Sequence, residues 1–137
     1  MDILSFSTIA DQIKREVNHK CGLNISQTRI LLFFDKNNNK ALTMGNLANE
    51  LNISLSTLSR QLQQKKTQNF IKVNKSEKDS SKSVKLNNRG LKKASELKTA
   101  LKQIETILFS FLDEEEFNNF TKQLSTVVKS SNEISTD

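Results

Sequence analysis

Apolar residues recur at steps of three and four along most of the chain, the spacing that places them on one face of an α-helix. These steps predict a first helix over residues 2–20. A second helix is expected to begin at Ser26, whose hydroxyl can cap it, and to end in the polar loop 35–40. Thr43 is the predicted N-cap of a third helix.

The fourth predicted helix, over residues 54–68, has few apolar positions. Leu58 and Leu62 are expected to face inward, and serine, threonine, glutamine and basic residues fill most of the rest. No acidic residue occurs from 51 to 76, whereas an ordinary surface helix mixes both signs of charge. Asn52 precedes it and tolerates the left-handed conformation of a tight turn. Helix, short turn and acid-free helix together indicate a helix-turn-helix.

Two short strands are predicted directly after this helix, over residues 70–74 and 83–86. The segment that joins them, residues 75–82, is polar and rich in lysine. A hairpin in this position makes a wing. The expected fold is therefore mainly α with a small β wing: a winged helix-turn-helix with N- and C-terminal dimerisation helices.

Two further helices are predicted in the last third of the chain, one over residues 87–112 and one capped by Asp113. The first would be about 39 Å long, more than a domain of this size can cover, so its apolar stripe favours a core shared between two subunits. We expect the chain to divide into a helical dimerisation region, residues 1–25 and 87–137, and a DNA-binding lobe, residues 26–86. The side chains predicted to pack across the dimer are Ile9, Ile13, Leu97, Leu101, Ile104, Leu108, Phe117, Phe120 and Leu124.

Charge is concentrated rather than spread. The chain has 137 residues and a formal net charge of +6, but residues 54–93 alone carry eleven basic and two acidic side chains, a net charge of +9. A basic segment of this kind is typical of a surface that contacts nucleic acid. With one histidine and one cysteine, the chain lacks the four nitrogen or sulfur ligands typical of a structural zinc site, and a single histidine leaves few options for a nucleophile with its base. We therefore expect no enzyme activity, cofactor or metal. The sequence has no run of about 18 apolar residues, so no membrane span is expected, and its single cysteine favours the reducing cytoplasm.

The order of elements resembles the MarR family of bacterial transcription regulators from about Ile9 to Val128. LTMGNLANEL at residues 42–51 is similar to the family's "LT...LA..L" helix, NISLSTLSR at 52–60 to the start of its recognition helix, and LNNRG at 86–90 to its "LTxxG" motif. The wing departs from the family's Asp-x-Arg pattern, because DSSK at 79–82 contains no arginine.

Two further departures lie after the recognition helix. Lys65 stands where the family usually has an inward leucine, and Asn69 replaces a glycine, a position at which asparagine can adopt the left-handed cap. Lys65 is expected either to extend its ammonium group to solvent or to mark a shifted helix end.

The resemblance implies a homodimeric, sequence-specific regulator of transcription, a repressor that occupies a pseudo-palindromic operator on double-stranded DNA. The recognition helix 54–68 would enter the major groove, and the wing 75–82 would follow the backbone or minor groove. The residues expected to contact DNA are Thr43, Ser54, Leu55, Ser56, Thr57, Ser59, Arg60, Gln63, Lys75, Lys78 and Lys82. A small-molecule effector is a further expected partner, with a pocket near His19, Arg29 and Phe33.

Two other functions stay open on the sequence. One is a thiol redox sensor that uses Cys21, although a small buried apolar residue is the simpler interpretation of this cysteine. The other is a winged helix that binds protein and not DNA. The clustered lysines argue against it, since the core of a protein interface is depleted of lysine.

Overall fold

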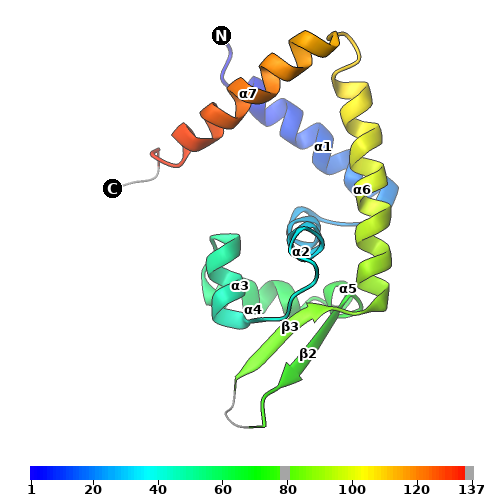
Figure 1. Ribbon diagram of the computed structural model, residues 1–137, viewed down its shortest axis with the longest axis vertical. Helices are drawn as coiled ribbons and strands as arrows, with labels where there is room; N and C mark the ends of the chain where they lie inside the picture. The colour runs from blue at the N-terminus through cyan, green and yellow to red at the C-terminus, as the bar shows by residue number, and fades with distance from the viewer. Residues whose placement is uncertain (78–80, 135–137) are drawn as a thin grey trace. The chain divides into compact units, whose positions relative to one another are not determined.

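Helices make up most of the computed structural model, which describes residues 1–77 and 81–134 (Figure 1). In chain order the elements are α1 (Ser5–Cys21), α2 (Ile25–Lys36), β1 (Leu42–Thr43), α3 (Met44–Leu51), α4 (Leu55–Gln63), α5 (Lys65–Gln68), β2 (Ile71–Lys75), β3 (Lys82–Leu86), α6 (Asn88–Leu108) and α7 (Glu114–Ser131). The chain forms two compact units, Met1–Lys102 and Gln103–Asp137. The predicted fold class, mainly α with a small β wing, is confirmed.

The start of α2 differs from the prediction, since its N-cap is Asn24 and not Ser26. The Asn24 side chain accepts a hydrogen bond from the backbone N–H of Gln27, and the Gln27 side chain accepts one from the backbone N–H of Asn24, both at 2.9 Å. Ser26 lies inside the helix and donates its hydroxyl to Asn24 Oδ1. A glutamine three residues after Asn24 completes this reciprocal pair, whereas Ser26 is followed at that spacing by Arg29, which has no acceptor.

Helix α6 ends at Leu108, four residues before the predicted end. In the turn that follows, the ring of Phe109 contacts Phe117 and Phe120 of α7, with centroids 5.1 and 5.4 Å apart. These aromatic contacts favour a turn at Phe109 over a further helical turn. Asp113 caps α7 as predicted, since its side chain accepts a hydrogen bond from the backbone N–H of Glu116 at 2.8 Å.

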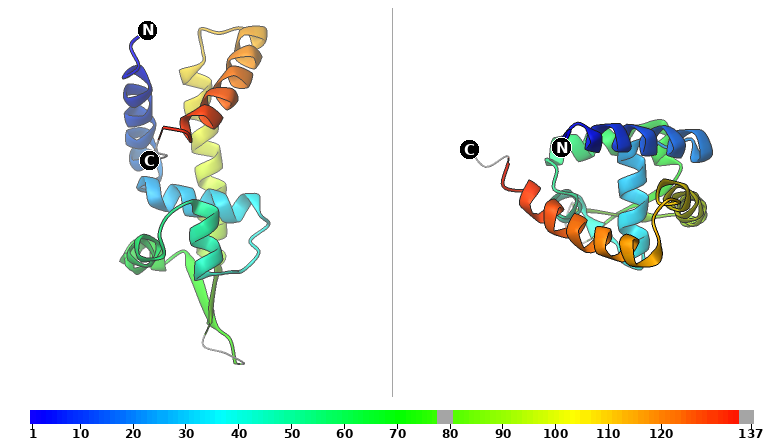
Figure 2. Two further views of the ribbon diagram at one scale, coloured as in Figure 1. Left: turned by 90° about the vertical axis from the view of Figure 1, so that its left-hand side faces the viewer. Right: turned by 90° about the horizontal axis from the view of Figure 1, so that it is seen from above.

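The sheet has three antiparallel strands in the order β1-β3-β2. Val84 of β3 faces Leu42 on one side and Val73 on the other, and both Val84 and Leu86 are buried. Beyond the short β1, strands β2 and β3 continue as a two-stranded hairpin that extends away from the helices of the first unit (Figures 1 and 2). The predicted wing is therefore present, and β1 is a strand that the prediction missed.

One core holds the elements of the first unit together. It contains fully buried side chains from α2, α3, α4, β3 and α6, of which the largest are Phe34, Ile30, Leu31, Leu47, Leu58, Val84, Leu86 and Leu97. Helices α3 and α4 thus pack on the same core as the wing strand β3. The recognition helix and the wing are consequently attached to one core.

Gly90 allows the first turn of α6 to pack closely against Phe70, the residue before β2. A Cβ atom at this position would lie 2.2 Å from the carbonyl oxygen of Phe70 and 3.0 Å from Cβ of Leu86. Asn87 joins the same elements, because its backbone N–H donates to Phe70 O and its side chain accepts from the backbone N–H of Gly90. Only glycine permits this close approach.

We expect Gly90→Ala to destabilise the protein by about 1–3 kcal/mol, because the added methyl group must displace a backbone carbonyl. The matched control is Gly45→Ala in α3, where an added Cβ meets nothing within 4 Å. This change should be neutral or stabilise the helix by roughly 0.5–1 kcal/mol. Urea unfolding at one protein concentration measures both, and equal stability of the two variants would contradict the close-approach argument.

Candidate nucleic-acid interface

A left-handed residue sets the angle between α3 and α4. Asn52 has φ 56° and ψ 45°, the conformation predicted for this turn. The backbone N–H of Ile53 then donates to the carbonyl oxygen of Ala48 at 3.0 Å, which closes the end of α3. Ser54 begins α4 as its N-cap, with its hydroxyl accepting a hydrogen bond from the backbone N–H of Thr57.

The polar face of α4 is directed outward because the apolar face of this helix is buried. Leu58 and Leu62 are 0% and 7% exposed, as expected for inward positions. Ser56, Arg60 and Gln63 lie on the far side of the helix and are all exposed. The predicted contact residues Thr57 and Ser59 are half-buried on its flanks, and Leu55 at the start of the helix is exposed.

Helix α4 ends at Gln63, so the prediction of one helix over residues 54–68 is wrong. Gln64 is extended, with φ −61° and ψ 130°, and the short helix α5 follows it. In a continuous helix Lys65 would lie three residues after Leu62, on the buried face. The break leaves Lys65 exposed and buries Thr67 instead, at 2% exposure. The expected shift of the helix end thus explains Lys65.

Asn69 also differs from the prediction. Its backbone is right-handed, with φ −65° and ψ −19°, and not left-handed. Since α5 is a separate short helix, the turn into β2 needs no left-handed cap. The backbone carbonyl of Asn69 instead accepts a hydrogen bond from the side chain of Asn87 at 2.9 Å.

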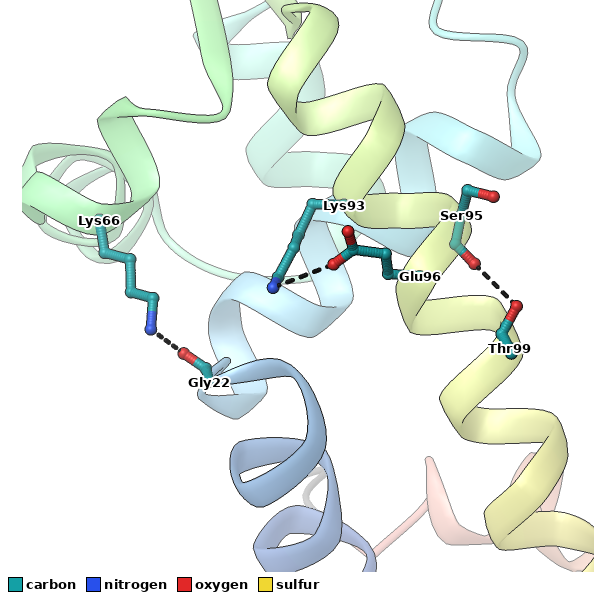
Figure 3. Close-up of polar contacts among 6 residues, drawn as sticks. All are labelled: Gly22, Lys66, Lys93, Ser95, Glu96 and Thr99. Atoms are coloured by element: carbon teal, nitrogen blue, oxygen red, sulfur yellow. Dashed lines mark hydrogen bonds and ion pairs between the residues drawn. The ribbon is translucent and has the colours of Figure 1, made fainter.

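The break is held by contacts to the turn between α1 and α2. Gln64 Oε1 accepts a hydrogen bond from Asn24 Nδ2 at 3.2 Å, and Thr67 Oγ1 accepts one from Gln27 Nε2 at 3.3 Å. Lys66 donates its ammonium group to the carbonyl oxygen of Gly22 (Figure 3). The end of the recognition helix is therefore anchored to the α1–α2 turn, which the sequence pattern did not reveal.

The wing places lysines opposite one another. Across β2 and β3, Lys72 faces Lys85 and Lys75 faces Lys82. Like charges directly opposite in a sheet repel, so a nearby anion such as a phosphate would stabilise this hairpin. The predicted contacts Lys75 and Lys82 are exposed, and Lys78 lies outside the described residues.

The recognition helix and the wing line one hollow of about 360 Å³. Ser59 and Gln63 contribute from α4 and Lys82 from β3, with apolar side chains of α3 and β2 between them. Residues that the sequence predicted separately as base-reading and wing contacts are thus brought to one surface.

The predicted effector-pocket residues are less closely grouped. His19 and Arg29 are exposed, and Phe33 is half-buried with its ring edge against Phe34 at 5.6 Å. A second hollow, of about 440 Å³, lies at the α1–α2 turn and is lined by other residues: Lys14, Arg15, Asn18, Leu23, Asn24 and Ile25. The effector pocket stays a prediction. Cys21 is 8% exposed and lies among the buried residues.

The predicted dimerisation residues vary in exposure. Leu97 is fully buried in the core of its own chain, and Ile104 is also buried. Ile9, Leu108 and Phe120 are each about 40% exposed, while the half-buried ones are Ile13, Leu101, Phe117 and Leu124. Helix α7 buries none of its side chains.

Two other properties concern the described residues as a whole. Within residues 1–77 and 81–134, no three His, Cys, Asp or Glu side chains cluster so that they could hold a metal ion. In the same part of the chain no helix has the length and apolar character needed to span a membrane.

Comparison with known proteins identifies the fold. Residues 22–80 match the model of the MarR family. Structures similar to this chain include MarR, at 16% identity and a TM-score of 0.79 over 98% of this chain and 93% of that one. The MepR–DNA complex of Staphylococcus aureus has 21% identity and a TM-score of 0.79 over 95% and 98%. No curated protein matches by sequence.

A third similar structure is the heme sensor PefR of Streptococcus agalactiae in complex with heme, at 19% identity and a TM-score of 0.69 over 93% of this chain and 88% of that one. These similarities extend over both the winged helix and the flanking helices. The predicted resemblance to the MarR family is confirmed.

We expect Thr67→Val to lower the free energy of unfolding by about 1–3 kcal/mol, because it leaves the buried amide of Gln27 without its acceptor. Thr99→Val is the matched control. The Thr99 hydroxyl is exposed on α6 and donates to the carbonyl oxygen of Ser95 (Figure 3), so its loss should change stability by less than about 0.5 kcal/mol. Thermal unfolding of both variants tests this. If Thr67→Val were as stable as the wild-type protein, the hydrogen bond between Gln27 and Thr67 would not be needed for stability.

Proposed function

We propose, from the premise that this chain has the winged-helix fold of the MarR family, that it is a cytoplasmic, homodimeric transcription regulator and not an enzyme. It would repress transcription by occupying a pseudo-palindromic operator. The observation that carries the proposal is the shared hollow of α4 and the wing, lined by Ser59, Gln63 and Lys82. All of its lining residues except Met44 lie within residues 54–93, whose net charge is +9.

In this proposal α4 enters the major groove. The width of that groove admits one helix, and the N-terminal part of a recognition helix reaches the base edges. Arg60 can donate two hydrogen bonds to a guanine, and the Gln63 amide can pair with an adenine. The backbone N–H groups at the capped starts of α3 and α4, after Thr43 and Ser54, would lie near phosphates.

The wing would supply affinity and little sequence preference. Its lysines are point charges without the planar guanidinium group that makes two parallel hydrogen bonds. A phosphate between Lys75 and Lys82 would also relieve the repulsion across the strands. Lys78, in the loop between them, is proposed as a further contact. The similar MepR of Staphylococcus aureus was solved in complex with DNA, which supports the same partner for this chain.

The dimer is proposed from apolar surface that one chain leaves exposed. Ile107 and Phe111 are 70% and 98% exposed, and Val127 and Val128 of α7 are about half exposed. A monomer rarely exposes so many large apolar side chains in a unit as small as Gln103–Asp137. Pairing of residues 1–25 and 87–137 of two chains would cover them and place two copies of α4 about ten base pairs apart on DNA.

A small-molecule effector is proposed as a regulator of this binding. PefR, a similar protein, was solved with heme. For this chain we propose only that a ligand near His19, Arg29 and Phe33 shifts the position of the DNA-binding lobe. The lobe is attached to the α1–α2 turn through Gln64 and Thr67, so a ligand at that end of α1 has a direct path to the recognition helix.

Selection of bound sequences from random duplex DNA tests the proposed function. The expected result is an enriched pseudo-palindrome with half-sites about ten base pairs apart. Enrichment of no sequence would contradict sequence-specific binding, and absence of DNA binding at low salt would favour the protein-interaction alternative. A peroxide-induced release from DNA that is lost in Cys21→Ala would favour the redox alternative.

Arg60→Ala is expected to reduce the preference for operator over random DNA by about 1–3 kcal/mol per half-site, since a bidentate base contact is lost. Lys82→Ala should weaken binding to the operator and to random DNA by similar factors. It should also lower the slope of log affinity against log salt by about one per contact, or about two per dimer. Salt titrations on both duplexes measure this, with Lys122→Ala in α7 as the control. If Lys82→Ala alone lost the preference for operator over random DNA, Lys82 and not Arg60 would be the residue that reads bases.

Leu108→Lys is expected to convert the dimer into a monomer, because it places a charge in the proposed apolar interface. Sedimentation at micromolar concentration measures the mass, and the monomer should bind the selected operator much more weakly. Leu91→Lys, at a leucine of α6 with a similar exposure of 42% that is not among the side chains predicted to pack across the dimer, should remain a dimer. A monomeric wild-type protein would contradict the dimer.

A further inference from the structure

The apolar stripe of α4 continues beyond the core at the N-terminal end of the helix. Leu55 precedes Leu58 by three residues and Leu62 by seven, so the three leucines lie along one face. Leu58 and Leu62 are almost fully buried, but Leu55 is 55% exposed. The first residue of the recognition helix therefore presents much of an apolar side chain to solvent.

The polar groups beside Leu55 already bond to one another. The Ser54 hydroxyl accepts from the backbone N–H of Thr57, donates to its hydroxyl at 2.8 Å and lies 3.1 Å from the Ser56 hydroxyl. The Thr57 hydroxyl also accepts a hydrogen bond from Arg60 at 3.4 Å. These internal bonds occupy the short side chains of the first turn, so Leu55 is the group there with no polar partner to satisfy.

The surroundings indicate what covers this leucine. It lies at the start of the acid-free segment 51–76, and the first residues of a recognition helix meet base edges when the helix enters the major groove. The only methyl group that the four bases present in that groove is the 5-methyl group of thymine. Against any other base the leucine would cover donors and acceptors without replacing their hydrogen bonds, which is unfavourable.

We infer that Leu55 is a specificity-determining residue that contacts the 5-methyl group of one thymine in each half-site. The inference rests on the proposed function, because it requires α4 to lie in the major groove. It adds a base preference that hydrogen bonds from α4 do not supply, and Leu55 is the one exposed side chain in the first turn of α4 that is entirely apolar.

Deoxyuridine provides the test, because it differs from thymidine by this methyl group alone. Thymines of the duplex selected by the wild-type protein are replaced one at a time. We expect one replacement per half-site to weaken wild-type binding about fourfold, the effect of removing one buried methyl group. Leu55→Ala should bind the thymine and uracil duplexes equally at that position, and Leu55→Met, which keeps an apolar side chain, should still distinguish them.

Leu91→Ala, at an exposed leucine of α6, is the control and should keep the wild-type response to uracil. Thermal unfolding should show Leu55→Ala to be folded, since its side chain is outside the core. A wild-type protein that binds the duplex but responds to no replacement overturns the inference and leaves the proposed function standing. If Leu55→Ala still binds the uracil duplex as much more weakly as the wild-type protein does, the inference is also overturned and the proposed function stands. A wild-type protein that binds no DNA overturns both.

Discussion

Burial of Leu58 and Leu62 determines the rotation of α4 about its axis, and the surface proposed to contact DNA depends on it. With these two leucines in the core, Ser56, Arg60 and Gln63 can only face outward. The core also holds Val84 and Leu86 of the wing strand, so the recognition helix and the wing keep a constant spacing. A DNA duplex requires such spacing, because its grooves lie at set distances from one another.

The two ends of the recognition helix are secured by different means. Its start depends on backbone conformation and local caps at Asn52 and Ser54. Its end depends on hydrogen bonds from the α1–α2 turn, 40 residues away in the sequence, of which the one between Gln27 and Thr67 is buried. A change in the position of α1 would consequently act on the C-terminal end of α4 and leave the turn with α3 intact.

Affinity and specificity are assigned to different parts of the surface. The wing carries directly opposed lysines, which would attract phosphates of any sequence, and α4 carries one arginine, amides and an exposed leucine, which are proposed to distinguish bases. Because this wing lacks the arginine of the family pattern, most base discrimination would come from α4.

Local signals were enough to predict the fold class, the helix-turn-helix and the surface of α4. The spacing of Leu58 and Leu62, the caps at Thr43 and Ser54 and the left-handed Asn52 each depend on residues a few positions apart. What the sequence could not show depends on distant partners. Strand β1 exists only because β3 pairs with it, and α4 stops at Gln63 because Asn24 and Gln27 hold the residues that follow. Such contacts form only when the chain folds, so tertiary structure alone determined where the recognition helix ends and which residues share its surface with the wing.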